Sequence, residues 1–309
     1  MSETDKPVSR LPGIYARGLA MGAADVVPGV SGGTLALITG IYEELIDTLG
    51  GIGPHLFSVW RRDGFASMWR QANLTFLLVL LAGVFSSIAV LASVITHLLA
   101  TYPVPMWAFF SGLIGASVWL VLARLRSISA AMIINLLAGF ALAWWIGTQP
   151  GLQAVADGPL VFFASGALAI CAMILPGISG SFILLLLGMY QAVLGAVHER
   201  EFLLLLSFVA GCAIGLLLFV RVLKFMLHRY HDPVMGLLAG FMAGSLNKLW
   251  PWRVPVEGTL LEQNLLPSVY TQSSGLPAMQ GWAALALVTG VALVWLLYRI
   301  GSVHNEGNG

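Results

Sequence analysis

Pro28-Gly29-Val30-Ser31-Gly32-Gly33-Thr34 interrupts the first apolar stretch of the chain, and its pattern returns 148 residues later as Pro176-Gly177-Ile178-Ser179-Gly180-Ser181. Twelve positions beyond each proline the pattern continues, as Gly40-Ile41-Tyr42 and Gly188-Met189-Tyr190. Proline lacks an N–H donor and clashes with the preceding turn, and glycine tolerates positive φ, so a helix should stop at each copy. The serine that follows is a favoured N-cap residue for a second helical arm. We predict two broken helices, with arms at 11–27 and 31–48 in the first copy and at 160–175 and 179–197 in the second.

The composition is that of an integral membrane protein. Apolar residues make up 58% of the chain and charged residues 9%, whereas about 25% of an average soluble domain is charged. The formal net charge of +1 gives no reason to expect a nucleic-acid partner. The two cysteines, Cys171 and Cys212, both lie in apolar segments and are expected to be buried thiols without a disulfide framework. No metal-ligand spacing or other cofactor motif is present.

Six further stretches have the 17–25 residues that a helix needs to cross the hydrocarbon core. They are Leu74–Leu99, Pro105–Ala123, Ala131–Gly147, Phe202–Val222, Pro233–Trp250 and Met279–Tyr298.

The distribution of basic residues decides how the two broken regions cross the membrane. If both are hairpins that return to their starting side, 12 basic residues lie on one face and 3 on the other. The larger group is Lys6, Arg10, Arg17, Arg61, Arg62, Arg70, Arg124, Arg126, Arg221, Lys224, Arg229 and Arg299, and the smaller is Arg200, Lys248 and Arg253. If each region crosses once, the counts become 7 and 8. The positive-inside rule therefore favours hairpins, with both termini in the cytoplasm.

The two halves of the chain share more than the broken hairpins. Pro105, Gly112 and Ser117 match Pro233, Gly240 and Ser245, and Gly139 and Trp144 match Gly290 and Trp295. Each half is therefore a hairpin followed by three spans, at residues 1–150 and 151–309. Because three is odd, the second half enters from the opposite side. We predict an all-α polytopic fold of two inverted repeats, each a re-entrant-type broken hairpin plus three transmembrane helices, an arrangement common in transporters.

Two other segments have a predicted place at the membrane surface. Residues 51–73 link the first hairpin to its spans and include Leu56–Trp69, where aromatic residues accompany Arg61, Arg62 and Arg70. This composition is typical of an interfacial helix that rests on anionic lipid. Residues 251–277 contain four prolines and are predicted to form a polar external loop.

The hairpin tips are the predicted binding site. Broken helices leave backbone groups that lipid cannot satisfy, so they occur where protein or a cavity surrounds them. The first N–H groups of each second arm, the positive end of its dipole and nearby hydroxyls suit an anion. We predict phosphate binding by Ser31, Gly32, Gly33, Thr34, Ser179, Gly180 and Ser181, with Pro28, Gly29, Pro176 and Gly177 as the helix-break residues. The alternative is that these small residues only permit close helix packing.

Two charged residues lie on the first arm of the first hairpin. Asp25 precedes the break by three residues, at a depth where a carboxylate costs about 2.5–3.5 kcal/mol on insertion scales. It could bind a coupling proton or sodium ion, pair with Arg17, or cap the broken backbone. Arg17 could hold a phosphate through a bidentate contact or extend toward the lipid headgroups. Glu43, Glu44 and Asp47 end the second arm and are expected to be solvated. No cluster of nucleophile, base or metal ligands appears, which argues against an enzyme.

The motif residues resemble a known family. Residues 24–34, followed by Gly40-Ile41-Tyr42-Glu43 and by a second copy at residues 175–180, resemble the bacterial polyprenyl-phosphate translocase family, over about residues 15–298. The resemblance implies a multi-pass protein of the bacterial inner membrane that returns undecaprenyl phosphate from the outer to the cytoplasmic leaflet for cell-envelope synthesis. By motif, it assigns functional importance to Asp25, to residues 28, 29 and 31–34, and to residues 176, 177, 179 and 180.

Other functions remain open at the level of sequence. The same paired tips could serve a carrier or channel for a small inorganic anion or for a cation-coupled solute, and a scaffold without transport activity would explain the hydrophobicity but not the paired breaks. A lateral opening toward lipid would favour a lipid substrate. The sequence leaves open the coupling ion, the net direction of transport and whether the chain forms a homo-oligomer.

Overall fold

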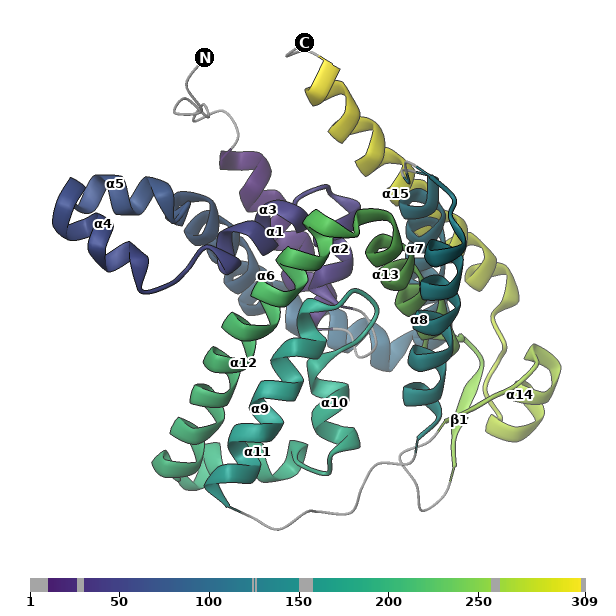
Figure 1. Ribbon diagram of the computed structural model, residues 1–309. Helices are drawn as coiled ribbons and strands as arrows, with labels where there is room; N and C mark the ends of the chain where they lie inside the picture. The colour runs from purple at the N-terminus through teal and green to yellow at the C-terminus, as the bar shows by residue number, and fades with distance from the viewer. Residues whose placement is uncertain are drawn as a thin grey trace.

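A computed structural model describes residues 11–26, 31–123, 125, 127–149, 158–256 and 262–306. Helices dominate this part of the chain, and one small two-stranded sheet lies beside them (Figure 1). The first half contains α1 (Leu11–Asp25), α2 (Gly32–Ile38), α3 (Tyr42–Gly50), α4 (His55–Asp63), α5 (Phe65–Gln71), α6 (Leu74–Thr101), α7 (Pro103–Ala123) and α8 (Ala130–Thr148). The second contains α9 (Pro159–Ile174), α10 (Gly180–Leu186), α11 (Tyr190–Glu199), α12 (Phe202–Arg229), α13 (His231–Ser245), the 3-10 turn η2 (Leu246–Leu249), β1 (Arg253–Pro255), β2 (Glu262–Asn264), α14 (Pro267–Ser274) and α15 (Gln280–Glu306).

Five helices of the described residues are long and apolar enough to cross a membrane, namely α6, α7, α8, α12 and residues 280–299 of α15. They confirm five of the six predicted spans and the prediction of a multi-pass membrane protein. The sixth, Pro233–Trp250, is shorter than predicted, because α13 ends at Ser245 and the polar Asn247 and Lys248 lie in the tighter turn of η2. Pro251 follows, and a proline cannot continue a helix.

The second arm of each hairpin is broken once more, which differs from the continuous arms predicted at 31–48 and 179–197. Gly40 and Gly188 have φ of +75° and +68° and end α2 and α10. In each copy two backbone hydrogen bonds close the helix end. The glycine amide donates to the carbonyl three residues earlier, and the next amide, of Ile41 or Met189, donates to the carbonyl five residues earlier. This is the Schellman motif, which needs a left-handed residue and therefore favours glycine. The next helix leaves at a sharp angle, 101° between α10 and α11.

Matching glycines bring the long helices together in the two halves. Gly18 of α1 packs on the Leu80 carbonyl of α6, and Gly166 of α9 packs on the Phe208 carbonyl of α12. These contacts are equivalent under the sequence repeat, with α1–α6 corresponding to α9–α12. A side chain at either glycine would overlap backbone atoms of the neighbouring helix, so close packing fixes both residues.

The remaining long helices pair across the two halves. Gly112 of α7 and Gly290 of α15 each pack against the backbone of the other helix, and so do Gly139 of α8 and Gly240 of α13. In the sequence, Gly112 matches Gly240 and Gly139 matches Gly290. The α7–α15 contact and the α8–α13 contact are therefore equivalent under the sequence repeat.

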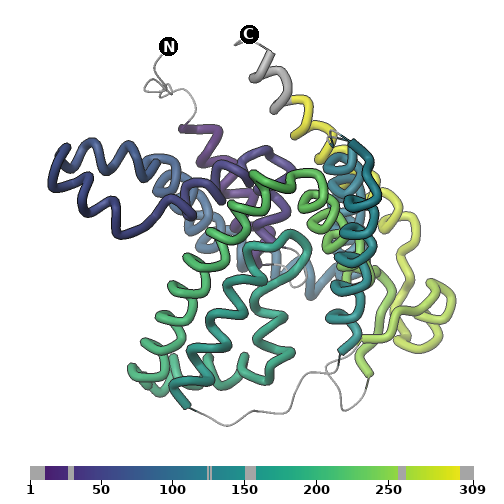
Figure 2. The backbone as a smooth tube through the Cα atoms, in the orientation of Figure 1, coloured from purple at the N-terminus to yellow at the C-terminus, as the bar shows by residue number. Residues whose placement is uncertain are grey.

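The helices define two opposite ends of the molecule. Helix α12 is about 42 Å long at 1.5 Å per residue, and it contacts α11 near its start and α3 near its end. We name the end with α3, α4 and α5 the α4 face and the end with α11 the α11 face (Figure 1). The described part of α1 begins at the α4 face, and α9 begins at the α11 face (Figure 2).

The predicted polar loop at 251–277 carries secondary structure of its own. Strands β1 and β2 pair in antiparallel register, with Val254 opposite Gln263, and α14 follows. Trp252 donates from Nε1 to the Ala278 carbonyl at 2.7 Å and holds the segment against the start of α15.

Candidate functional site

The two hairpin tips contact each other in the interior and satisfy each other's backbone. The Ser31 hydroxyl donates to the Met173 carbonyl at 3.0 Å, and the Tyr42 hydroxyl donates to the Ile174 carbonyl at 3.2 Å. In return, Gly177 N donates to Thr34 Oγ1 at 3.0 Å. The carbonyls at the broken end of α9 would otherwise lack partners at a depth where no water satisfies them. The contact between the tips therefore stabilises both breaks.

The first tip is closed by its own side chains. Asp25 Oδ1 accepts a hydrogen bond from Gly32 N at 2.7 Å, and Ser31 Oγ accepts one from Gly33 N at 3.2 Å. Ser31 and Thr34 are buried, with 1% and 0% of their surface exposed. Of the roles considered for Asp25, the structure shows the capping of the broken backbone. The amides predicted to bind phosphate at Gly32 and Gly33 are already occupied here.

Glycine is required where the tips approach most closely. Gly177 has φ of +85°, and a Cβ at this position would lie 2.8 Å from the backbone of Met242 in α13. A Cβ on Gly33 would lie 2.7 Å from the Ile174 carbonyl oxygen. Pro176 and Gly177 lie between α9 and α10 and confirm the second predicted break. Pro28 and Gly29 lie outside the described residues, although α1 ends before them and α2 begins after them.

The second tip borders a cavity of about 250 Å³. Gly177, Ile178 and Ser179 form one wall, and residues of α7, α8, α10, α13, η2 and the β1–β2 segment provide the rest. Ser179, the N-cap residue of α10, makes no hydrogen bond to the first amides of that helix, and its hydroxyl lies 2.8 Å from the Ser181 hydroxyl. The second tip therefore differs from the first, since no carboxylate among the described residues caps it.

Two cations line this cavity. Lys248 of η2 extends along Gly147 of α8, and its amine lies 4.8 Å from the ring centroid of Phe182. Within the described part of the chain, the Lys248 amine forms no ion pair. The Glu262 carboxylate attracts this amine but is already paired with Arg253, so the partly desolvated ammonium remains a strong attractant for an anion.

The second cation is held in a fixed position. The Arg253 guanidinium lies 3.8 Å from the centroid of the Trp107 ring, donates to the Lys248 carbonyl, and forms an ion pair with Glu262 at 2.7 Å. Burial lowers the pKa of Arg253, and the negative charge of Glu262 opposes that effect. Glu262 neutralises Arg253, so the charge of Lys248 remains. The three side chains together therefore carry a net positive charge.

One side of the cavity wall is apolar, although Gln149, Ser179 and Ser245 also line the cavity. Ile146 of α8 and Phe182, Leu185 and Leu186 of α10 line it. Unlike α2, which is entirely buried, α10 is half-buried over most of its length. The cavity therefore combines a cationic end with a hydrophobic wall, as an amphiphile with an anionic head requires.

The structure separates the predicted phosphate residues into three groups. Ser179 lines the cavity, and Gly180 and Ser181 begin the helix behind it. Ser31, Gly32, Gly33 and Thr34 lie at the closed first tip. Arg17 lies two turns before the end of α1, with Nη1 close to Gly13 and therefore on the side away from the tip.

Sequence reasoning missed the cavity residues Lys248, Arg253, Glu262, Ser245 and Trp107. A signal for two of them was present. Only three basic residues were assigned to the sparsely charged face, and two of these flank the end of one predicted span. The spacing of Lys248 and Arg253 in the sequence did not show that both residues fold against the second hairpin.

Comparisons with known proteins show the family of the chain. Residues 21–264 match the model of a family described as undecaprenyl phosphate translocase-like. The chain is 46% identical to the polyprenyl-phosphate transporter of Vibrio cholerae, over 91% of this chain and 94% of that protein. It is 31% identical to the polyprenyl-phosphate transporter of Staphylococcus aureus, over 76% of this chain and 84% of that protein. No solved structure matches the chain. These relatives are transporters, which confirms that the chain is not an enzyme, and the chain belongs to the undecaprenyl phosphate translocase-like family.

Proposed function

We propose that this protein translocates undecaprenyl phosphate, or a similar polyprenyl phosphate, across the bacterial inner membrane. The observation that carries the proposal is the cavity at the second tip, where Lys248 and Arg253 face an apolar wall of α8 and α10. A phosphate monoester carries one to two negative charges and cannot cross hydrocarbon without a polar path. The cavity offers its head a cation, and the apolar wall offers its prenyl chain a surface.

The apolar wall favours a lipid over a small inorganic anion. A site for a free anion needs no contiguous hydrophobic side, whereas Phe182, Leu185 and Leu186 provide one along the half-buried α10. Family membership and both named relatives support the same substrate class.

We propose that the two halves are inverted repeats that alternate access to the contact between the tips. Equivalent glycine contacts in the two halves support this arrangement, as does the entry of α1 and α9 from opposite faces. In this scheme the α4 face is cytoplasmic, since it carries most of the basic residues. Ser58 and Ser268 are exposed positions on the two faces and provide a test. With a single cysteine at either position in a chain without Cys171 and Cys212, an impermeant maleimide added to intact cells should label only position 268.

The proposed direction is from the outer to the cytoplasmic leaflet, which would return the carrier lipid for further envelope synthesis. A membrane potential negative inside opposes inward movement of an anion by about 2.3 kcal/mol per charge per 100 mV. A co-transported proton or sodium ion would offset this cost, and Asp25 is the proposed site. Because the amide oxygen of an asparagine at this position could still accept the Gly32 N–H, Asp25→Asn separates capping from coupling. Unchanged transport and unchanged proton and sodium dependence in this variant would exclude the coupling role.

Reconstitution tests the function directly. Purified protein in vesicles should move a fluorescently labelled prenyl phosphate between leaflets, measured as the fraction that an impermeant quencher reaches over time. Empty vesicles are the first control and give the rate of transfer without protein. Labelled prenyl alcohol is the second control, and the protein should not accelerate its transfer. Efflux of inorganic phosphate without movement of the lipid would replace the proposal with a small-anion carrier.

A further inference from the structure

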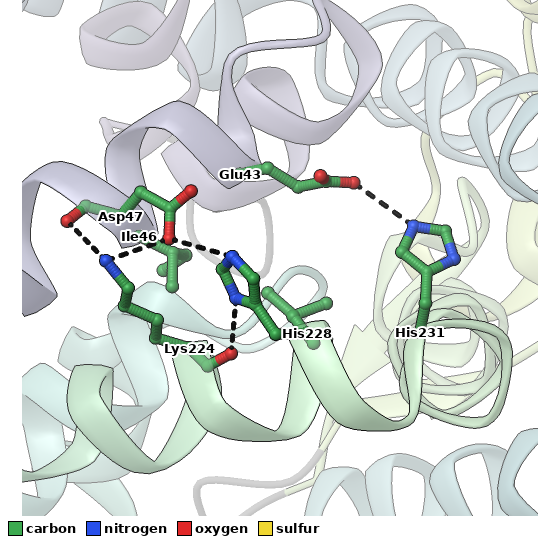
Figure 3. Close-up of a pocket in the computed structure, with 7 residues that line it drawn as sticks. Glu43, Ile46, Asp47, Lys224, His228 and His231 are labelled. Carbon is green, nitrogen blue, oxygen red and sulfur yellow. Dashed lines mark hydrogen bonds and ion pairs between the residues drawn. The ribbon is translucent and has the colours of Figure 1, made fainter.

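A polar cluster on the α4 face joins the first hairpin to the second half of the chain. It consists of Glu43 and Asp47 on α3, Lys224 and His228 on α12, and His231 at the start of α13, and these residues surround a pocket of about 170 Å³ (Figure 3). We call these five residues the latch. Its two carboxylates come from the first half and its basic groups from the second, so its contacts cross the boundary between the halves.

The latch is held by several ion pairs and hydrogen bonds. The Lys224 amine lies 3.1 Å from Asp47 Oδ1 and also donates to the Asp47 carbonyl at 3.3 Å. His228 Nε2 lies 3.7 Å from the same carboxylate, and His231 Nε2 lies 3.2 Å from Glu43 Oε1 (Figure 3). Two residues beyond the end of α3, the Ile52 carbonyl accepts a hydrogen bond from Arg221 at 2.9 Å. The end of the first hairpin is thus fastened to α12 and α13 at several points.

The short helices of the two hairpins differ in burial. Helix α2, which leads from the first tip toward the latch, is buried along its whole length, whereas α10 borders the cationic cavity. The cavity and the latch lie at opposite ends of the α13–η2 segment, since His231 begins it and Lys248 lies in its last turn. Ion pairs therefore join the two halves at the α4 face, and the cationic cavity lies at the other end of the α13–η2 segment.

We propose that the latch is the gate of the α4 face and must open before the phosphate head can leave toward that side. The inference rests on the proposed transport function and adds the residues that control release. Partly exposed ion pairs contribute little stability individually, and Lys224 and Asp47 are 36% and 43% exposed. Such pairs can hold a closed state and still separate during a transport cycle.

A disulfide across the gate tests the proposal. A Cβ placed on Gly50, at the end of α3, would lie 3.5 Å from the Cβ of Lys224, within the range that a disulfide spans. Gly50→Cys and Lys224→Cys are combined in a chain whose Cys171 and Cys212 are replaced by alanine. Each single-cysteine variant, given the same oxidant, is the matched control. Mass spectrometry establishes that the bond has formed.

The oxidised double variant is expected to transport labelled prenyl phosphate at least tenfold more slowly than the same protein after reduction. Its binding of a short-chain prenyl phosphate, measured by calorimetry in detergent, should change less than twofold, because the cavity lies at the other end of α13. Equal transport in the cross-linked and reduced forms would overturn the gate. Loss of binding together with transport would also contradict it, since the latch would then not be separate from the cavity. If the reduced protein and the native chain both fail to transport, the proposed function itself fails.

Discussion

At the scale of single residues, Lys248 is the group on which recognition of the anionic head should depend most. Its amine faces the cavity without an ion-pair partner among the described residues, whereas Arg253 is already paired with Glu262. A hydrogen bond to a charged group contributes about 1.5–3 kcal/mol. Lys248→Met should therefore weaken binding of a prenyl phosphate by roughly 10- to 150-fold, as measured by calorimetry in detergent.

Three controls separate this effect from general damage in Lys248→Met. Lys248→Arg keeps the charge and should restore part of the affinity. Arg200→Met removes an exposed cation at the end of α11, outside the cavity, and should leave the affinity unchanged. Binding of prenyl alcohol should be equally weak in all variants. An affinity for prenyl phosphate that does not change in Lys248→Met would remove this lysine from the site.

Gly177 is the residue whose replacement should damage the fold of the second tip most directly. Its φ of +85° costs an L-residue about 1–2 kcal/mol, and a Cβ would approach the Met242 backbone to 2.8 Å. Overpacking of this kind costs typically 1–3 kcal/mol more. Gly177→Ala should therefore lower the free energy of unfolding by about 2–5 kcal/mol, observed as a lower midpoint of thermal unfolding in detergent.

A glycine with free space provides the comparison for Gly177. Gly115 lies in the middle of α7, and nothing lies within 4 Å of the Cβ it would gain. Gly115→Ala should leave the midpoint unchanged or raise it, since alanine is favoured over glycine in a helix by up to about 1 kcal/mol. Equal midpoints for the two variants would contradict the strain assigned to Gly177.

At the scale of elements, the sequence predicted the helix breaks but not what surrounds them. Proline and glycine impose local conformations, so the end of α9 at Ile174 could be predicted from Pro176-Gly177. The break after α2 carried an equally local signal, Gly40, whose positive φ ends the helix. Lys248 and Arg253 were assigned to the smaller charge group, but the contact of Lys248 with Phe182 of α10 depends on long-range packing. The local bonds at the first tip could be anticipated, since the sequence offered a serine N-cap and capping as one role of Asp25. The bond from Ser31 to the Met173 carbonyl could not, because it depends on packing between the halves.

Helices α4 and α5 should lie in the headgroup region of the leaflet next to the α4 face. They are short, joined at Gly64 with φ of +82°, and extend away from the helical body (Figure 1). Phe57, Trp60 and Phe65 are 57%, 49% and 56% exposed, and the Arg61 guanidinium lies 5.7 Å from the centroid of the Phe57 ring. Exposed aromatic rings next to arginines are typical of a helix that binds an anionic interface.

An environment-sensitive fluorophore tests this placement. Attached to Trp60→Cys in a chain without Cys171 and Cys212, it should emit at shorter wavelength in vesicles with anionic lipid than in detergent. The same fluorophore on Gln263→Cys, in the exposed strand β2, should show a much smaller shift. Similar emission at the two sites would place α4 in water instead.

At the scale of the whole molecule, the two halves have related contacts but different degrees of closure. Helix α2 is buried and contacts α7, α15 and α9, whereas its counterpart α10 borders the cavity. If the halves exchange conformations during transport, α10 should close against α8 and α13 while α2 separates from α7 and α15. The structure then represents one end state, and the sequence repeat indicates which residues exchange environments.

Leu37 and Leu185 form the matched pair that tests this exchange, since they occupy equivalent positions 148 residues apart. Leu37 is 6% exposed, and Leu185 lines the cavity. With cysteine at either position in a chain without Cys171 and Cys212, a small maleimide should react readily at 185 and slowly at 37 when no substrate is present. During transport of prenyl phosphate the rate at 37 should rise severalfold and the rate at 185 should fall. The disulfide between positions 50 and 224 should abolish the rise at 37, because α3 then cannot leave α12. If substrate raises the reaction rate at both positions, the protein loosens generally and the halves do not exchange conformations. If substrate changes neither rate, the protein does not alternate between two conformations, and the exchange is excluded.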